Sequence, residues 1–408
     1  MKIVVQKFGG TSVKDDEARH TAMKHVAYAV KKGFKAADVV SAIGRKGAPY
    51  ATDSMLELVG NEKSKLSPRE MDMLVSVGEV ISAAVFCEML KENGLKATAM
   101  TGPDAGFKTN NDYRNAKVLD VEKQNVMEAF KSFDVDVVAG FQGLSKSGHV
   151  TTLGRGGSDT TAVALAAALH ADACEIYTDV DGVYTADPRK VPNARKLKEI
   201  TYDEMLDLAT LGAGVLHNRS VEMAKKYGVP LVVRSSLNNS EGTVVKEEVT
   251  VERMLISGVA LDTDAVRIAV IGLRDVPGVA FKLFDVLAKK HINVDVILQS
   301  IGRAGTKDIS FTVDGKDLDD AMAALEEHKT RLGYQELHAE RNIAKLSIVG
   351  AGMMSNPGVA AKMFESLYNE GVNINMISTS EIRVTVLINE KDGVRAMNAV
   401  HDAFNLAD

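Results

Sequence analysis

The residues best suited to binding or catalysis lie between Thr151 and Ala162, in the run Thr-Thr-Leu-Gly-Arg-Gly-Gly-Ser-Asp-Thr-Thr-Ala. Glycines let backbone N–H groups approach an anion, and the alanine-rich helix expected at about 161–170 points its positive end at that anion. Arg155 adds a planar donor for a carboxylate or a phosphate. Asp159 is negative, so it suits the orientation of donors or the holding of Mg²⁺ better than the attraction of phosphate. The turn therefore predicts a place where an anionic substrate meets a phosphate.

A lysine after the first apolar run, Ile3–Val5, offers a second phosphate contact. Lys7 stands just before Gly9 and Gly10. A lysine beside a Gly-Gly turn can reach the β- and γ-phosphates of a nucleotide as a point charge. The spacing does not match a Walker A loop. A surface lysine beside a tight turn is therefore the simpler alternative.

Three further polar side chains could bind a small substrate. Ser41 ends the second apolar run, and Thr52 follows a loop with Gly and Pro, where a helix N-cap is an equally good explanation. Gly78 and Glu79 lie within a long helical pattern. Glycine in a helix interior costs about 1 kcal/mol relative to alanine, which indicates close packing or ligand access. Glu79 could accept an ammonium group, and a solvated helix carboxylate is the alternative.

A turn-rich segment follows the apolar run 174–178. It reads Tyr-Thr-Asp-Val-Asp-Gly-Val-Tyr from Tyr177 and Thr-Ala-Asp-Pro-Arg from Thr185. Asp-Gly and Asp-Pro are turn signals. The spacing does not match an EF-hand, and no bidentate glutamate follows at the required place. A nucleotide-contacting loop, with Arg189 available to phosphate, is the functional interpretation.

The composition is that of an ordinary soluble chain of 408 residues, with 45% hydrophobic and 25% charged residues. The net charge of −6 and the lack of a basic run argue against a nucleic-acid partner. No apolar run approaches the roughly 20 residues that span a bilayer, so we expect no membrane contact. Cys87 and Cys174 have no metal-ligand spacing, so we expect buried thiols in a reducing, cytoplasmic compartment. Dispersed histidines such as His217 are expected to be structural.

Strand and helix patterns alternate up to about residue 250. Apolar runs occur at 3–5, 38–42, 135–139, 174–178 and 230–233, and helical stretches such as 16–32, 69–93 and 202–208 lie between them. This alternation predicts a layered α/β domain with a largely parallel sheet, which binds ligands at the carboxyl ends of its strands. The stretch 238–252, with Ser, Gly and several charges, is the expected linker.

The remainder of the chain contains an internal repeat. Val276–Lys282 (Val-Pro-Gly-Val-Ala-Phe-Lys) recurs as Asn356–Lys362 (Asn-Pro-Gly-Val-Ala-Ala-Lys), a shift of 80 positions from 276 to 356. The same shift superposes Ser300 on Ser380 without a gap. Each copy reads as a strand, a Pro-Gly turn, an amphipathic helix and a second strand. We therefore expect two small α+β units.

Together these motifs resemble those of the aspartokinases, members of the amino-acid kinase superfamily. The resemblance covers the whole chain and is strongest at Lys7–Val13 (KFGGTSV), Ser76–Glu79 (SVGE), Thr152–Ala162 (TLGRGGSDTTA) and Tyr177–Arg189 (YTDVDGVYTADPR). It implies a three-layer αβα kinase domain at 1–250 with a mostly parallel sheet. Two ferredoxin-like ACT domains are implied at 264–340 and 341–408, the second completed by a strand from 251–263.

The resemblance implies a monofunctional aspartate kinase that uses ATP with Mg²⁺ and has no metal site of its own. One rival is a kinase for glutamate or acetylglutamate, which would have no duplicated effector units. The other is a non-catalytic amino-acid sensor, which would be expected to have lost one of the key charged residues. Those residues are all present: Lys7, Glu79, Arg155 and Asp159.

Residue by residue, the resemblance assigns three groups. Lys7 and Asp159 are catalytic, because the lysine stabilises the transferring phosphoryl group and the aspartate orients that lysine. The substrate residues are Arg155 for the α-carboxylate, Glu79 for the α-ammonium, and Ser41, Thr52 and Ser158 to complete the pocket. The ATP-binding residues are Lys7, Gly9, Gly10, Thr178, Asp179, Tyr184 and Arg189.

The chain departs from the family pattern at three places. Gly214 stands where relatives often carry a lysine that contacts nucleotide, which leaves only backbone for that contact. Asn218 replaces a proline that is common in the family. Arg45–Tyr50 lengthens the loop between Ser41 and Thr52 relative to many relatives.

Effector binding between the ACT domains is implied at the Pro-Gly turns and at the strand starts that follow. The candidates are Asp275, Val279, Asn293, Asp295, Gln299, Val359, Ala360, Asn373, Ile374, Ser380 and Glu381. Simple strand-to-helix turns are the alternative. Lysine, threonine and diaminopimelate are the possible effectors, and a homo-oligomer or an α2β2 assembly through the ACT domains is expected. Met254 or a nearby methionine could start a separate regulatory subunit.

Overall fold

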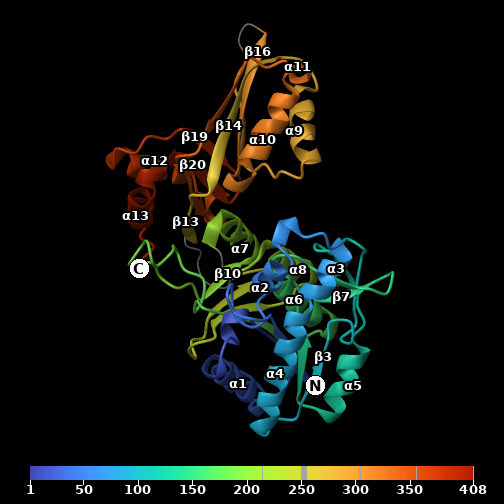
Figure 1. Cartoon of the computed structure of the whole chain (residues 1–408). Helices are drawn as coiled ribbons and strands as arrows, with labels where there is room; N and C mark the ends of the chain where they lie inside the picture. The colour runs from blue at the N-terminus through green and yellow to red at the C-terminus, as the bar shows by residue number, and fades with distance from the viewer. Residues whose placement is uncertain (214, 250–254, 303–304, 355, 408) are drawn as a thin grey trace. The chain divides into compact units, whose positions relative to one another are not determined.

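The computed structural model describes residues 1–213, 215–249, 255–302, 305–354 and 356–407, so Gly214 and Met254 lie outside the described residues. The chain divides into two compact units (Figure 1). Within the described residues, the first unit comprises 1–183, 196–209 and 215–249. The second comprises 184–195, 210–213 and the described residues from 255 onwards.

The first unit is built on an eight-stranded sheet in the order β10-β12-β11-β9-β1-β2-β6-β3. Its neighbouring strands are parallel except for the antiparallel pair β11 and β12, which confirms the predicted, largely parallel sheet. The strands are β1 (Lys2–Phe8), β2 (Phe34–Val40), β3 (Ala97–Met100), β6 (Val135–Ala139), β9 (Ala173–Thr178), β10 (Glu199–Thr201), β11 (Leu231–Ser235) and β12 (Thr243–Lys246). All five residues of β6 are buried, which requires cover on both faces of the sheet.

Helices supply this cover. Val26 and Phe86 share an apolar core with Phe8 and Val40 of the sheet, while the helix that begins at Gly157 contacts β1, β2 and β9. The helices are α1 (Asp16–Lys31), α2 (Thr52–Leu58), α3 (Pro68–Val75), α4 (Val77–Glu92), α5 (Gln124–Ser132), α6 (Gly157–Leu169), α7 (Tyr202–Leu208) and α8 (Asn218–Tyr227). A smaller sheet in the order β5-β4-β7-β8 contains β4 (Phe107–Thr109), β5 (Val118–Val121), β7 (Gln142–Ser145) and β8 (Val150–Thr152).

Two predicted helix boundaries were wrong. The helix expected at about 161–170 begins four residues earlier, so Gly157, Ser158 and Asp159 form the first turn of α6. Glycine is a poor helix former, which hid this start in the sequence. The helix expected at 69–93 is divided at Ser76 into α3 and α4.

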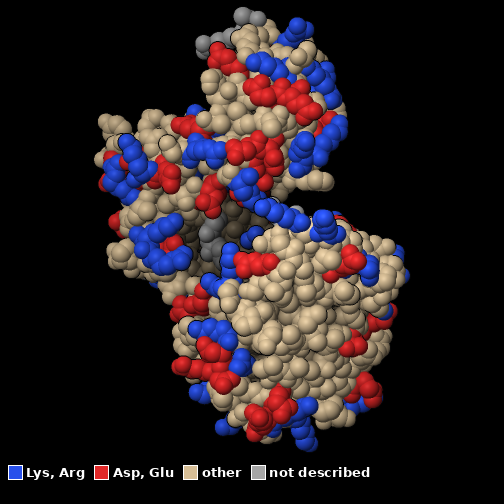
Figure 2. Space-filling view, viewed as in Figure 1, with Lys and Arg blue, Asp and Glu red and all other residues tan. Residues whose placement is uncertain are grey.

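The stretch Pro68–Glu92 is long and apolar enough, by length and composition, to cross a membrane. The prediction that no apolar run approaches this length was therefore wrong by these criteria. In the structure, 56% of its most apolar window is buried inside the protein, as in the core helix of a soluble domain. Positive and negative side chains are interspersed on the face shown in Figure 2.

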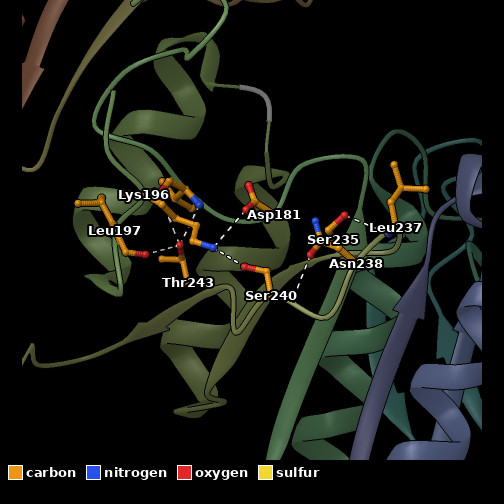
Figure 3. Close-up of polar contacts among 9 residues, drawn as sticks. Asp181, Lys196, Leu197, Ser235, Leu237, Asn238, Ser240 and Thr243 are labelled. Carbon is orange, nitrogen blue, oxygen red and sulfur yellow. Dashed lines mark hydrogen bonds and ion pairs between the residues drawn. The ribbon is translucent and has the colours of Figure 1, made fainter. Parts of the chain in front are cut away.

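The expected linker 238–252 contains a strand of the large sheet. Residues Thr243–Lys246 form β12, which pairs with both β10 and β11. Thr243 accepts a hydrogen bond from Val183 N–H at 2.9 Å and donates to the Leu197 carbonyl at 2.6 Å. Lys196 pairs with Asp181 at 3.1 Å and donates to Ser240, as Figure 3 shows. The strand was not predicted from the sequence because it is short and has only two apolar residues, which lie among polar ones.

The second unit contains two four-stranded antiparallel sheets, in the orders β15-β16-β14-β17 and β13-β18-β20-β19. Their strands are β13 (Gly258–Asp262), β14 (Ala265–Arg274), β15 (Ile297–Gln299), β16 (Thr306–Asp314), β17 (Glu336–Glu340), β18 (Ile343–Val349), β19 (Met376–Thr379) and β20 (Arg383–Asn389). The helices are α9 (Val279–Lys289), α10 (Leu318–Glu327), α11 (Lys329–Leu332), α12 (Val359–Asn369) and α13 (Gly393–Ala403).

The two sheets are copies of one plan, as the repeat predicts. Helices α9 and α12 begin and end 80 positions apart, at 279 and 359 and at 289 and 369. The shift falls to 75 by α10 and α13, which begin at 318 and 393. The edge strand β17 pairs with β14, and β13 takes the same place beside β18. The strand that the resemblance assigns to 251–263 therefore lies at Gly258–Asp262, before the first copy.

The segment Tyr184–Arg195 belongs to the second unit rather than the first. Ala186 and Val191 are buried in the same core as Met363 and Val400. The Thr185 hydroxyl lies 2.9 Å from His401 Nε2.

A polar cluster is buried within the large sheet. Gln6 lies opposite both Asp38 and Glu175 in the strand register, and its Nε2 donates to Glu175 Oε2 at 2.7 Å. Asp38 is fully buried, and neither its carboxyl oxygens nor Gln6 Oε1 has a partner among the described residues. Burial raises the pKa of Asp38 well above its ordinary value, and the charges of Asp136 and Glu175 add to this effect. The fold therefore favours a protonated Asp38, which has an O–H group to donate.

This protonation predicts an unusual effect of Asp38→Asn on stability. The raised pKa means that wild-type stability falls as the pH rises from the unfolded-state pKa of Asp38, near 3.8, towards its folded-state pKa. The amide cannot ionise, so the variant should be more stable than wild type at pH 7 to 8. The gain should shrink towards pH 4 in thermal melts. Asp120→Asn, at an exposed site, is the control, and a gain independent of pH would contradict the prediction.

Candidate active site

One pocket of about 610 Å³ in the first unit collects all the predicted catalytic and substrate residues. It is lined by Lys7, Ser41, Thr52, Glu79, Arg155, Ser158 and Asp159. Lys7 lies in β1, and Ser41 directly follows the neighbouring parallel strand β2. The carboxyl ends of these strands therefore meet at one edge of the sheet. The first turns of α2, α4 and α6 add Thr52, Glu79, Ser158 and Asp159 there, and the turn before α6 adds Arg155.

An ion pair joins the sheet to the glycine-rich turn. Lys7 Nζ lies 2.7 Å from Asp159 Oδ1, and the two side chains are only 12% and 15% exposed. Lys7 belongs to β1 itself rather than to the turn after it. Gly10 follows in close contact with the loop after β2, because an added Cβ would lie 2.4 Å from the Gly44 carbonyl oxygen. Lys7 and the backbone N–H groups at the amino end of α6 are thereby brought together.

The turn before α6 depends on glycine conformations. Gly154 and Gly156 have φ angles of 76° and 69°, which side chains rarely adopt. A Cβ on Gly156 would lie 2.3 Å from the His217 ring, so His217 packs directly against this turn. Arg219 donates to the Leu153 carbonyl at 2.7 Å. These contacts hold the backbone that carries Arg155 into the pocket.

Glu79 is a buried carboxylate that faces the pocket. It is 3% exposed, and its Oε1 accepts a hydrogen bond from Ala42 N–H at 3.1 Å. Its Oε2 is buried and has no partner among the described residues. Burial raises the pKa of Glu79 to about 8. A cationic group in the pocket would satisfy this oxygen and lower that pKa.

Gly78 sets the position of Glu79. A Cβ on Gly78 would lie 2.6 Å from Met55 Cε, 2.9 Å from Ala42 Cβ and 2.9 Å from the Tyr50 carbonyl oxygen. The close packing predicted for this glycine is therefore confirmed. Thr52 also lines the pocket, and it is not an N-cap, because Ala51 holds that position in α2.

Sequence reasoning missed Asp72 and the arginines 45 and 114. Asp72 is fully buried and accepts hydrogen bonds from the backbone N–H groups of Arg114 and Thr152 and from the Thr152 hydroxyl. Arg45 and Arg114 line the pocket. A carboxylate within the apolar pattern of α3 was the available signal for Asp72. The sequence marks Arg45 only as part of a lengthened loop, and no local pattern marks Arg114.

The predicted nucleotide residues divide between the units. Thr178 is the last residue of β9 and Asp179 follows it. Because β9 pairs with β1, both lie near Gly9 at the same sheet edge. Asp179 forms an ion pair with Arg45 at 3.1 Å. Tyr184 and Arg189 belong to the second unit, where Arg189 pairs with Asp187 at 2.9 Å and lowers the pKa of that carboxyl group. Within the described residues, no three His, Cys, Asp or Glu side chains gather as a metal site.

Two cavities in the second unit lie at the repeated Pro-Gly turns. One of about 500 Å³ is lined by Asp275 and Val279, and Lys307 pairs there with Asp275 at 2.7 Å. The other, of about 410 Å³, is lined by Val359, Ala360, Ser380 and Glu381. The remaining candidates line neither cavity: Asn293, Asp295, Gln299, Asn373 and Ile374. Asp295 instead pairs with the buried Lys345 at 2.8 Å.

Comparison with known proteins identifies the domains and the family of the chain. A model of the amino acid kinase family matches residues 2–235, and a model of the ACT domain matches residues 268–328 and 346–404. An aspartokinase of Bacillus sp. (strain MGA3) is 47% identical over 408 residues, which are 100% of this chain and 98% of that protein. The chain belongs to the aspartokinases. The resemblance predicted from the motifs is thereby confirmed.

Solved aspartokinases share the fold. E. coli aspartokinase III, described in complex with aspartate and ADP in the R-state, is 27% identical with a TM-score of 0.79, over 98% of this chain and 99% of that chain. The same enzyme in complex with lysine and aspartate, in the T-state, is 27% identical with a TM-score of 0.77, over 100% of both chains.

Proposed function

We propose that this aspartokinase transfers the γ-phosphoryl group of MgATP to the β-carboxylate of L-aspartate, giving 4-phospho-L-aspartate and ADP. This reaction opens the route to lysine and diaminopimelate, threonine and methionine. The observation that carries the proposal is the content of the 610 Å³ pocket. Among the described residues, it combines a buried carboxylate with one unsatisfied oxygen, an arginine without a carboxylate partner, and a largely buried Lys–Asp pair at a helix amino end.

Each part of the substrate has a matching group. Glu79 accepts the α-ammonium, which satisfies its unpaired Oε2. Arg155 holds the α-carboxylate, since a guanidinium suits a carboxylate geometrically. Ser41, Thr52 and Ser158 complete the polar lining. Held this way, the substrate turns its β-carboxylate towards Lys7.

The phosphate side of the site has to compensate for negative charge. Lys7 is oriented by Asp159 at 2.7 Å and lies near the amino end of α6, where N–H groups and the helix dipole favour an anion. Gly9, Gly10, Thr178 and Asp179 line the MgATP side, and the resemblance adds Tyr184 and Arg189. Mg²⁺ carried by the nucleotide neutralises charge on the β- and γ-phosphates.

The chemistry needs no protein nucleophile. The β-carboxylate of aspartate is ionised at neutral pH, so it attacks the γ-phosphorus directly and no general base is required. The protein has to place two mutually repelling anions in line and stabilise the charge that spreads over the transferring group. Lys7 is the side chain positioned for that task.

We further propose feedback inhibition through the second unit, in a cytoplasmic homo-oligomer or α2β2 assembly. Lysine, threonine or diaminopimelate would bind at the two Pro-Gly cavities, which contain six of the predicted effector residues: Asp275, Val279, Val359, Ala360, Ser380 and Glu381. The lysine complex of the similar E. coli enzyme supports an amino-acid effector.

The reaction is tested by ATP-dependent formation of aspartyl hydroxamate. Wild type should give the product with L-aspartate, and Lys7→Ala should lower kcat by about 100- to 1000-fold, the typical loss when a charge-stabilising donor is removed. Lys14→Ala, an exposed lysine near the same turn, should retain activity. Absence of product from the wild type with aspartate would refute the proposed function.

The role of Glu79 predicts a pH dependence. Without substrate, Glu79 has a pKa of about 8. Below that pH its carboxyl group must lose a proton before the substrate ammonium can bind. The KM for aspartate should therefore fall as the pH rises to about 8 and then level off. Glu79→Gln should raise KM by about tenfold to 100-fold and remove this dependence. Glu88→Gln, on the exposed face of α4, is the control, and an unchanged pH profile in Glu79→Gln would contradict the role.

Feedback is tested by adding lysine, threonine and diaminopimelate, singly and in pairs, to initial-rate assays and thermal melts. At least one should inhibit the rate and raise the melting temperature, because a ligand stabilises the state that it binds. Glu381→Gln should weaken that inhibition about tenfold, whereas Glu365→Gln on the exposed face of α12 should not. If none of the three alters rate or stability, this part of the proposal fails.

A further inference from the structure

Four cationic residues line the active-site pocket, and two of them have no carboxylate partner among the residues that the structure describes. Lys7 pairs with Asp159 at 2.7 Å, and Arg45 pairs with Asp179 at 3.1 Å. Within the part of the chain that the structure describes, neither Arg114 nor Arg155 forms an ion pair. Arg155 holds the α-carboxylate in the proposed substrate complex. That complex leaves Arg114 without a role.

Arg114 has an unusual backbone conformation. Its φ angle is 69°, in the left-handed region that favours glycine. Phe141, with a φ of 68°, has the same kind of conformation and also lines the pocket. Such conformations cost about 1 kcal/mol or more and persist where the surroundings hold them, often at binding sites. An arginine at this position therefore carries a local cost in stability.

Asp72 holds Arg114 in this conformation. Both of its carboxyl oxygens accept from the Arg114 backbone N–H, at 3.1 and 3.0 Å. The same carboxylate accepts from the Thr152 N–H at 2.8 Å and from the Thr152 hydroxyl at 2.7 Å. Asp72 thereby anchors two loops that are distant in sequence, the loop of Arg114 and the turn that leads to Arg155.

The two loops are in direct contact beside the pocket. A Cβ on Gly154 would lie 3.0 Å from the Arg114 carbonyl oxygen, so the backbones of Arg114 and of the residue preceding Arg155 touch. Arg114 and Arg155 are both exposed, and both line the pocket. Lys7 and Asp159, in contrast, are only 12% and 15% exposed. The two arginines are therefore more accessible than the Lys7–Asp159 pair on the phosphate side of the pocket.

We propose that Arg114 is a further substrate-binding residue, which shares the α-carboxylate of aspartate with Arg155. The inference rests on the proposed function of this pocket. The α-carboxylate takes no part in the reaction, so two guanidinium groups can hold it without lowering the reactivity of the β-carboxylate. Arg114 therefore contributes to affinity and to the choice of a substrate with a free α-carboxylate.

The variant Arg114→Gly distinguishes a role in substrate binding from a role in stability, because it should weaken aspartate binding without lowering the melting temperature. Glycine accepts a φ of 69° without strain, so the melting temperature should hold or rise. Loss of the guanidinium should raise the KM and Kd for aspartate about fivefold to tenfold, a range that reflects an exposed charge-assisted contact. The kcat and the KM for ATP should change little. Arg114→Lys keeps the positive charge but loses the planar guanidinium. Its KM and Kd for aspartate should lie between those of wild type and of Arg114→Gly.

His170→Gly is the matched control. His170 has a φ of 51° at the carboxyl end of α6, and it does not line the pocket. This variant should gain stability with no change in KM. A second probe is L-aspartic acid α-amide, used as a competitive inhibitor. Its inhibition constant should be the same for wild type and Arg114→Gly, because it has no α-carboxylate charge.

An unchanged aspartate KM and Kd in Arg114→Gly would overturn the inference, as would equal weakening of aspartate and its α-amide. A shift confined to the KM for ATP would also overturn it. Isothermal titration of aspartate into the full chain distinguishes this inference from the proposed function. Wild type that binds aspartate but forms no hydroxamate refutes the kinase reaction alone. Wild type that does not bind aspartate refutes both.

Discussion

Parallel pairing of β1 with β2 on one side and β9 on the other is the constraint on which the active site depends. Parallel strands bring their carboxyl ends to the same edge, so Lys7, Ser41 and Thr178 are neighbours although up to 171 positions separate them (7 to 178). Helices that begin at this edge then add their amino ends, with Asp159 in α6 and Glu79 in α4. The chemistry of the pocket is therefore a consequence of strand order.

Buried carboxylates have three different roles in the first unit, and their partners decide which. Asp72 uses its oxygens on backbone and hydroxyl donors, so it fixes loops. Glu79 accepts a hydrogen bond from Ala42 N–H with one oxygen, and its other oxygen has no partner among the described residues, so it can bind a ligand in the pocket. Asp38 has no donor among the described residues and lies in the sheet, so the fold favours its neutral form. Burial alone does not identify a functional acid.

The sequence predicted the features that depend on short segments. Glycine turns, strand ends and the Pro-Gly repeat are local patterns, and from them came the sheet, the two repeated units and the residues that share the pocket. Asp72 and Arg114 were missed because their importance lies in hydrogen bonds across 42 and 80 positions, which leave no local pattern. The strand β12 was missed for a similar reason. Its polar residues resemble a linker until Thr243 is seen to bond Val183 and Leu197.

The position of the edge strand β13 in the sequence affects how the second unit is synthesised and how its repeats can recombine. Gly258 pairs with Val349, so the ribosome makes this strand 91 residues (258 to 349) before its partner in β18. The first repeat lies between these two strands and has its own four-stranded sheet, so it can fold while β13 is still unpaired. A recombination event that cut the chain between β17 and β18 would leave the second sheet without its edge. The two repeats can therefore be exchanged between proteins only together.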